Sequence, residues 1–236
     1  ARALGFDHLD ATVGLTQITC TFHRGEYFRT VIARQHSPAV DASRIEALED
    51  LTHNRLYAGI TAQELAAMLD VIEFGVKKRW SGLVLSFAAA IACAAFAYLN
   101  FFPLEAVGLV ALAAFAGQFV RYTVLHRHVH QIGGVIAGGA TASIVFFLLT
   151  AFFGAIGSVD PSELSSGVVA AVLFLIPGFP LFSALIDIAR FDLDAGIVRL
   201  GYAFTVIFTA TFTVSMVSWL TQLTPDPPAP AQDMRW

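Results

Sequence analysis

The feature that most constrains this chain is a series of apolar runs between Ser81 and Leu220. Five runs can be separated: Ser81 to about Phe102, Glu105 to Val120, Gly133 to about Gly157, Gly167 to Arg190, and Gly196 to Leu220. A helix needs about 20 mainly apolar residues to cross the ~30 Å hydrocarbon core of a bilayer. The runs therefore predict five transmembrane helices.

The composition agrees with a membrane protein and separates a polar first third from the rest. The chain is 56% hydrophobic and 14% charged, with a mean hydropathy of +0.68. Residues 1–79 hold nine of the fourteen Lys and Arg and ten of the eighteen acids. We predict a mainly α, polytopic membrane protein with three parts: a small α/β cytoplasmic domain at 1–76, a five-helix transmembrane domain at 77–222, and a Pro-rich extracytoplasmic linker or tail at 223–236.

The first domain is predicted to contain a β-hairpin and two helices. Residues 11–22 partly alternate and are rich in Thr, Val and Ile, HRGE supplies a turn, and YFRTVIARQ resumes the strand pattern. Asp41 then precedes a helix that begins at Ala42, and Gly59 marks its stop. Thr61 and Glu64 form a capping box for a second helix that ends near residue 74.

Lys77, Lys78, Arg79 and Trp80 form a basic and aromatic anchor directly before the first apolar run. Such anchors mark the cytoplasmic face of a membrane. With Lys77 inside, thirteen of the fourteen basic residues lie at or near that face. The predicted orientation therefore places the N-terminal domain in the cytoplasm.

Two prolines interrupt the fourth apolar run. Pro177 and Pro180 lack the N–H groups that a continuous helix needs, and Gly178 between them relaxes the backbone. The break predicts a half-helix over residues 181–190 with the positive end of its dipole at the break. Secondary transporters hold small charged substrates with half-helices of this kind. The alternative is a bent helix with a purely structural role.

A dense group of polar and charged residues follows the break. Four of them, spaced by four, three and four positions, would share one face of a continuous helix: Ser183, Asp187, Arg190 and Asp194. Asp192 and Arg199 complete the group. Charges beside membrane-length apolar runs are costly unless they pair or line a hydrated cavity, so these residues are candidates for substrate or proton binding. The alternative is a solvated cytoplasmic turn.

The fifth run carries polar residues at helical spacing, on about one third of its circumference. They are Arg199, Tyr202, Thr205, Thr209 and Thr213. They could line a hydrated path leading outward from Asp187, in which Thr205 and Thr209 would bind substrate or protons. Threonine in a membrane helix also bonds the carbonyl four residues earlier, which requires no path. The spacing leaves both interpretations open.

No motif in the chain points to a cofactor, a metal or a nucleic acid. Cys20 and Cys93 stand alone, without the spacing of a disulfide framework or a metal site. A membrane-anchored hydrolase is the rival from another functional class, but it would need a Ser, Cys or metal constellation, and none is legible. A structural or assembly subunit is a third possibility.

Five residues of the fourth and fifth runs share a distinctive mutual spacing: Pro177, Gly178, Asp187, Gly196 and Arg199. At this spacing they resemble the N-terminal half of the threonine/serine exporter family. The hairpin with Arg34, the two following helices and the five runs extend the resemblance over nearly the whole chain. It implies proton-driven export of small amino acids such as threonine and serine across the bacterial cytoplasmic (inner) membrane. Some two-chain relatives are linked instead to dicarboxylate export of the succinate type.

The resemblance also implies a partner and a set of roles. The partner is a second, smaller group of spans, fused or on a separate chain. The half-helix N-terminus near Leu181 and Phe182 would receive the substrate carboxylate. Asp187 would bind the ammonium group or a proton, and Arg199 would pair with Asp187 when the site is empty.

Two departures from the family pattern bear on these expectations. The family's first segment, a helix with a Gly-Ala-Glu stretch, is expected to precede Ala1. Ser183 stands where many relatives are expected to have an amide, which leaves the identity of the substrate open.

Overall fold

The computed structural model describes residues 4–14, 17–34, 41–56, 60–76, 80–127, 129–156 and 167–221. They fall into two compact units. The N-terminal unit comprises Ala1–Arg79 and Leu181–Leu200, and the bundle unit comprises Trp80–Pro180 and Gly201–Trp236. Residues 77–79 of the predicted basic anchor and the Pro-rich tail at 223–236 lie outside the described residues.

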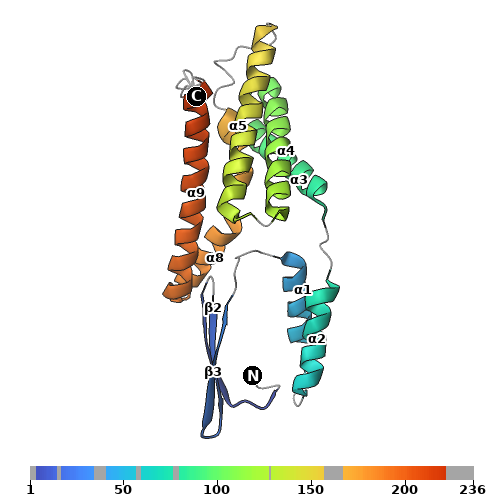
Figure 1. The fold of residues 1–236 in the computed structure, drawn as a ribbon, viewed down its shortest axis with the longest axis vertical. Helices are drawn as coiled ribbons and strands as arrows, with labels where there is room; N and C mark the ends of the chain where they lie inside the picture. Colours follow the sequence, from blue (N-terminus) through green and yellow to red (C-terminus); the bar gives the residue numbers. More distant parts are fainter. Residues whose placement is uncertain are drawn as a thin grey trace, which may run out of the picture. The chain divides into compact units, whose positions relative to one another are not determined.

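The N-terminal unit contains a three-stranded antiparallel sheet in the order β1-β2-β3 (Figure 1). The strands are β1 (His8–Val13), β2 (Gln17–Arg24) and β3 (Tyr27–Arg34). Gly25 has a φ of 59° and occupies the first central position of the two-residue turn between β2 and β3, as a type II′ turn requires. The predicted hairpin is therefore present. The single strand predicted over residues 11–22 is instead divided between β1 and β2, because Gly14 ends β1 and donates its N–H to the Gln17 carbonyl at 2.8 Å.

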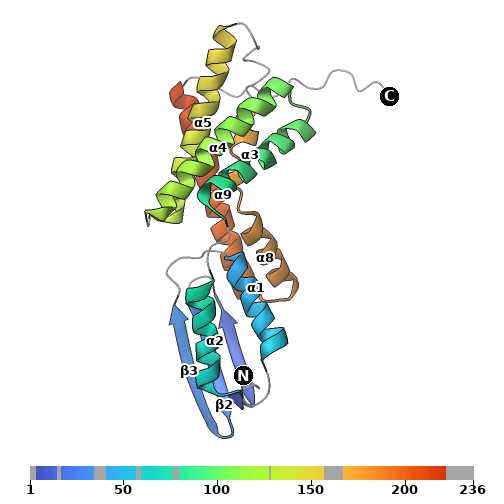
Figure 2. The same cartoon turned by 90° about the vertical axis from the view of Figure 1, so that its right-hand side faces the viewer.

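Two helices complete the polar part of this unit, and they lie side by side (Figure 2). Helix α1 (Ala42–Asp50) continues into a π-helical turn, η2 (Leu51–Arg55), and α2 spans Ala62–Gly75. The predicted capping box is present: the Thr61 hydroxyl accepts from the Glu64 N–H at 3.2 Å, and the Glu64 carboxylate accepts from the Thr61 N–H at 2.9 Å. The small α/β domain thus begins its second helix at the residue that the sequence indicated.

Four helices among the described residues are long and apolar enough to cross a membrane. They are α3 (Gly82–Leu99), α4 (Leu104–His126), α5 (Gln131–Ala155) and α9 (Leu193–Thr221). Helix α4 extends past the end predicted for its apolar run, so Arg121 lies inside the helix and not after it.

The fourth predicted span is divided into three short pieces: α7 (Gly167–Ala171), η3 (Leu173–Leu175) and α8 (Gly178–Ala189). At 1.5 Å per residue the 12 residues of α8 are about 18 Å long, which is shorter than the hydrocarbon core. The prediction of five spanning helices is therefore not confirmed, and four helices of spanning length stand in its place. The cause is the proline-containing break.

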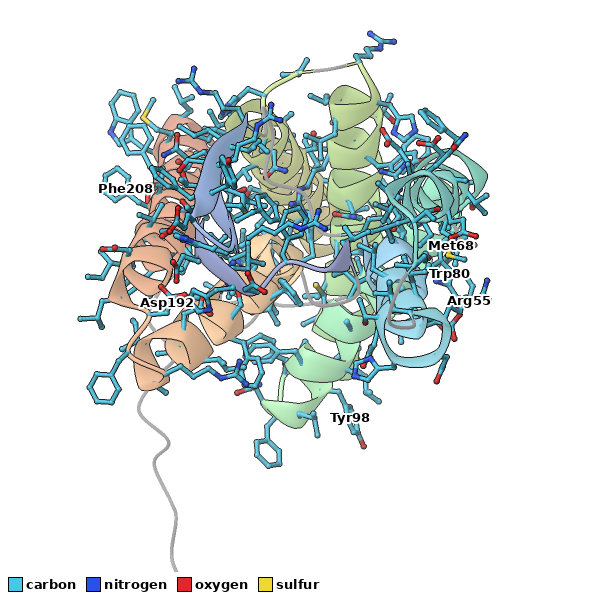
Figure 3. The ribbon with its side chains drawn as sticks, turned by 90° about the horizontal axis from the view of Figure 1, so that it is seen from below. Arg55, Met68, Trp80, Tyr98, Asp192 and Phe208 are labelled. Carbon is cyan, nitrogen blue, oxygen red and sulfur yellow. The ribbon has the colours of Figure 1, made fainter. Side chains whose placement is uncertain are left out.

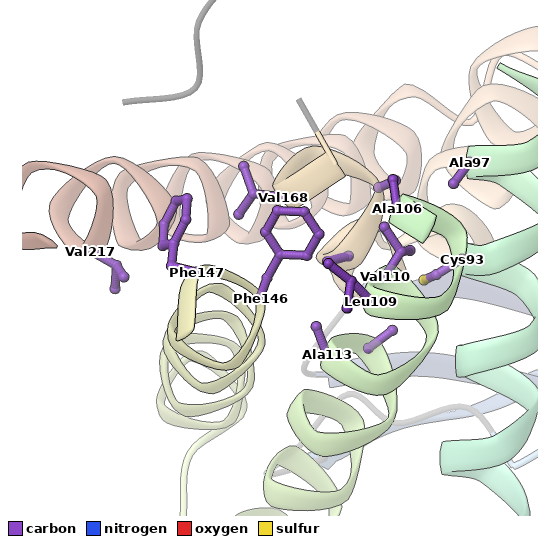
Figure 4. Packing of buried hydrophobic residues seen from close by; sticks show 13 residues of the cluster. Cys93, Ala97, Ala106, Leu109, Val110, Ala113, Phe146, Phe147, Val168 and Val217 are labelled. Atoms are coloured by element: carbon purple, nitrogen blue, oxygen red, sulfur yellow. The ribbon is translucent and has the colours of Figure 1, made fainter. Parts of the chain in front are cut away.

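The core of the bundle unit is built from α4, α5 and the buried pieces of the broken segment. Helix α7 packs against α3, α4 and α5, and Phe146 fills the space beside Val110 and Val168 (Figure 4). Gly167 has no room for a side chain, because a Cβ there would lie 2.6 Å from the Phe146 ring. This contact accounts for a glycine at the first residue of α7.

The outward faces of the long helices are apolar. Tyr98 and Phe208 project away from α3 and α9 in Figure 3 and are largely exposed, as is Trp80 before α3. Trp80 and Tyr98 lie near the two ends of α3, where aromatic residues suit the interface between lipid and water, whereas Phe208 lies in the middle of α9. The exposed faces are therefore suited to a lipid environment.

We predict that Gly117→Ala destabilises the bundle unit. A Cβ at Gly117 would lie 2.7 Å from the Ala142 Cβ and 2.7 Å from the Gly138 carbonyl oxygen, so α4 and α5 would have to separate. Overpacking of this kind costs about 1–3 kcal/mol, and the midpoint of thermal unfolding in detergent should fall. Gly108→Ala is the matched control on the same helix, because nothing lies within 4 Å of its Cβ position. Equal midpoints for the two variants would contradict this account of the packing.

Candidate functional site

The backbone of the broken segment departs from helical hydrogen bonding at both prolines. The Leu173 carbonyl accepts from the Ile176 N–H at 3.1 Å, and the Ile176 carbonyl accepts from the Gly178 N–H at 2.9 Å. In a continuous helix these carbonyls would accept from residues 177 and 180, which are prolines and have no N–H. The predicted break is therefore present at the predicted residues.

The half-helix begins earlier than predicted and offers fewer donors. Helix α8 starts at Gly178, so Pro180 does lie in its first turn. The Gly178 N–H is already bonded and Pro180 has none. Two of the first three positions therefore present no free donor to a substrate carboxylate, and the role assigned to this end stays a prediction.

Helix α8 ends in a tight turn that reverses the chain into α9. The Phe191 N–H donates to the Ile188 carbonyl at 3.0 Å, and the Asp192 N–H donates to the Asp187 carbonyl at 2.9 Å. This is the Schellman pattern, which needs a left-handed residue at Phe191, where φ is 62°. The turn brings the last turn of α8 next to the first turns of α9.

The central feature of this turn is an ion pair between the two helices. A guanidinium nitrogen of Arg199 donates to the Asp187 carboxylate at 2.5 Å. Both side chains are mostly buried, with 27% of Arg199 and 19% of Asp187 exposed. Removing one partner of a buried pair leaves an uncompensated charge, so each residue depends on the other. The pairing expected for the empty site is present, and its role in binding stays a prediction.

Gly196 explains how the two helices come close enough for this pair. A Cβ at Gly196 would lie 2.6 Å from a side-chain carbon of Ile188 and 3.1 Å from the Ala184 carbonyl oxygen. The start of α9 therefore rests directly on α8. Arg199 follows three residues later, which places it on the face of α9 that meets Asp187.

The other charged candidates lie in the same turn but outside the pair. Helix α8 stops at Ala189, so Asp194 does not continue the face carrying Ser183 and Asp187, as a continuous helix would have required. Arg190, Asp192 and Asp194 are exposed; Figure 3 shows Asp192 at the turn between α8 and α9. Asp194 lies in the first turn of α9, where a carboxylate is favoured by the helix dipole.

The threonines of α9 bond to their own helix. The hydroxyl of Thr205 donates to the Gly201 carbonyl at 2.9 Å, and that of Thr209 donates to the Thr205 carbonyl at 2.8 Å. Thr213 repeats the pattern on the Thr209 carbonyl at 2.8 Å. This is the arrangement that requires no hydrated path.

A second polar cluster, which the sequence reasoning did not single out, lies in the bundle unit. Arg121 of α4 interacts electrostatically with Tyr202 of α9, and the Tyr202 hydroxyl donates to the side-chain oxygen of Gln131 on α5. Gln118 lies one turn before Arg121, and both have buried polar atoms without a hydrogen-bond partner. The signal in the sequence is an arginine at the end of an apolar run, a pattern that predicts a helix end at this position.

Comparison with known proteins places the chain in a family. The family model ThrE, described as "Putative threonine/serine exporter", matches residues 1–221. The chain belongs to this exporter family. The resemblance seen in the five spaced residues is thereby confirmed.

Individual relatives in the family are distant. The "Probable succinate transporter subunit YjjP" of Escherichia coli is 22% identical over 230 residues, which cover 93% of this chain and 82% of that protein. A protein of the same name from Klebsiella aerogenes is 22% identical over 223 residues, covering 93% and 81%. No solved structure matches the chain.

We predict that Gly196→Ala disrupts the turn between α8 and α9. The added methyl group would have to displace Ile188 or the Ala184 carbonyl, which would lengthen the Asp187–Arg199 pair. The midpoint of thermal unfolding should fall, with a cost of about 1–3 kcal/mol. Gly201→Ala on the same helix is the control, because nothing lies within 4 Å of its Cβ position. A Gly196→Ala protein as stable as this control would show that the helices do not depend on that close contact.

Proposed function

We propose that the chain is one subunit of a proton-coupled secondary transporter that exports small amino acids such as threonine and serine. The observation that carries the proposal is the Asp187–Arg199 ion pair beside a proline-broken helix. Membership of an exporter family supports the same class of function. We place the protein in a bacterial inner membrane. The distribution of basic residues in the sequence favours a cytoplasmic position for the N-terminal domain.

The ion pair suits proton coupling because its strength depends on one proton. Ionised Asp187 holds Arg199 by charge and by a hydrogen bond at 2.5 Å. A proton on the carboxylate removes the negative charge, and the attraction between α8 and α9 weakens. Loss of the proton restores it. A proton gradient could therefore bias the turn between two arrangements, and a bistable element of this kind is what coupled transport needs.

A four-carbon dicarboxylate is the second candidate substrate. Two relatives that each cover 93% of this chain are named probable succinate transporter subunits. The word "subunit" in those names also supports a partner, which we propose is a second set of membrane spans. Flux of labelled threonine, serine and succinate from proteoliposomes, with and without that partner, separates the two substrates. A membrane-anchored hydrolase would instead release a cleaved product.

We predict that Asp187→Asn folds but loses export driven by a proton gradient. The amide keeps the shape of the side chain and cannot take up or release a proton, so gradient-driven efflux should fall at least about tenfold while exchange of labelled for unlabelled substrate continues. Both are measured in proteoliposomes with and without an imposed pH difference.

Glu105→Gln is the matched control for this measurement. It neutralises an exposed carboxylate in the first turn of α4 and should leave both rates unchanged. Normal gradient-driven export by Asp187→Asn would remove Asp187 from coupling and leave it as a structural partner of Arg199.

A further inference from the structure

Arg121 is a charge in the bundle unit that the proposed coupling step does not use. It lies five residues before the end of α4, a helix of spanning length. Its Nε atom is buried and has no hydrogen-bond partner. Among the residues that the structure describes, no carboxylate lies within ion-pair distance of it.

The surroundings of Arg121 are tightly packed and partly polar. A Cβ added at Gly138 of α5 would lie 3.0 Å from the Cβ of Arg121. The first carbon of the arginine side chain is therefore packed closely against the backbone of α5. Tyr202 packs on the small cluster of Val135, Leu175 and Val206, and its hydroxyl is engaged by Gln131. Within the described part of the chain, these neighbours of Arg121 are uncharged, so none of them cancels its charge.

Gln118 adds an unused polar group on the same face of α4. It precedes Arg121 by three residues, and side chains at this spacing are neighbours on a helix. Its side-chain oxygen is buried without a partner. A carbonyl oxygen here can accept from an ammonium or hydroxyl group, and rotation of the amide would present its donors to a carboxylate.

An unpaired guanidinium with a buried nitrogen is expensive to hold in a membrane bundle. Ionisable residues inside transmembrane helices are rare, and those that persist face a substrate or ion pathway. Arginine is also the side chain whose planar donors match both oxygens of a carboxylate. A carboxylate therefore matches this guanidinium in both charge and shape.

We propose that Arg121 receives a carboxylate group of the transported solute, with Gln118 contacting a second polar group of the same molecule. This inference rests on the proposed function, since it names a binding residue for the exported solute. The proposed binding site for the carboxylate is therefore Arg121 and not the start of α8, where Gly178 and Pro180 offer no free donor.

The test measures the reactivity of Arg121 directly. Membrane vesicles that contain the full-length protein with its partner are treated with phenylglyoxal, which modifies arginine, and the rate at each arginine is read by peptide mass spectrometry. Separate samples contain threonine, succinate or chloride. Arg127, which caps α4 and is exposed, is the internal control.

Arg121 should react more slowly when the transported solute is present, and Arg127 should not change. Protection by threonine alone identifies an amino-acid site, and protection by succinate alone identifies a dicarboxylate site. Equal protection by chloride means an adventitious ion only and overturns the proposal. If Arg121 does react with phenylglyoxal and its rate is unchanged by solute in vesicles that transport one solute, the proposal is overturned as well, while vesicles that transport neither solute overturn the proposed function with it.

A variant covers the case in which phenylglyoxal does not reach Arg121. Arg121→Lys keeps the positive charge but loses the two-pronged geometry, so the KM for the transported solute should rise at least about tenfold. The response of transport to an imposed pH difference should be retained, because Asp187 is intact. An unchanged KM in Arg121→Lys overturns the proposal.

Discussion

The bundle unit depends on close approach of helices at positions without side chains. Apolar helices in a bilayer gain little from the hydrophobic effect when they associate, so their packing relies on short distances and small residues. Gly117 of α4 and Gly138 of α5 provide that contact, since a Cβ on either would meet the backbone of the other helix at 2.7 or 3.1 Å. The same contact holds Arg121 against α5. The packing that stabilises the bundle therefore also positions the side chain of Arg121, to which we assign a role in substrate binding.

Arg199 of α9 and Arg121 of α4 are both partly buried, and the cost of that burial is met differently at each. Arg199 has its own acid, and the pair with Asp187 carries no net charge when both are ionised. Arg121 has no acid among the described residues and keeps a net positive charge. Protonation of Asp187 would change the net charge of the pair, whereas the unpaired positive charge of Arg121 attracts anions. Under the proposals made above, Arg199 takes part in proton coupling through its pair with Asp187, and Arg121 binds the transported solute.

Local chemistry made part of this structure predictable from the sequence. Pro177 and Pro180 dictate a break because they lack N–H groups, and the break lies where they are. The Thr61 and Glu64 capping box likewise depends on near neighbours alone. The position of Arg121 inside a helix was missed because the apolar run ends at residue 120, while the helix continues to His126 through a mixed polar and apolar segment. Hydropathy locates lipid contact, and only backbone hydrogen bonding locates the end of a helix.

The polar row of α9 has a consequence for movement. The hydroxyls of Thr205, Thr209 and Thr213 each donate a hydrogen bond to a carbonyl of the same helix, so none of them needs a partner on another helix. A helix whose polar groups are self-contained can rotate or slide against other helices without stranding a donor in hydrocarbon. Exchange of access between the two sides of a membrane requires such sliding surfaces. Under the proposed function, the self-bonded threonines would let α9 move against its neighbours during the transport cycle.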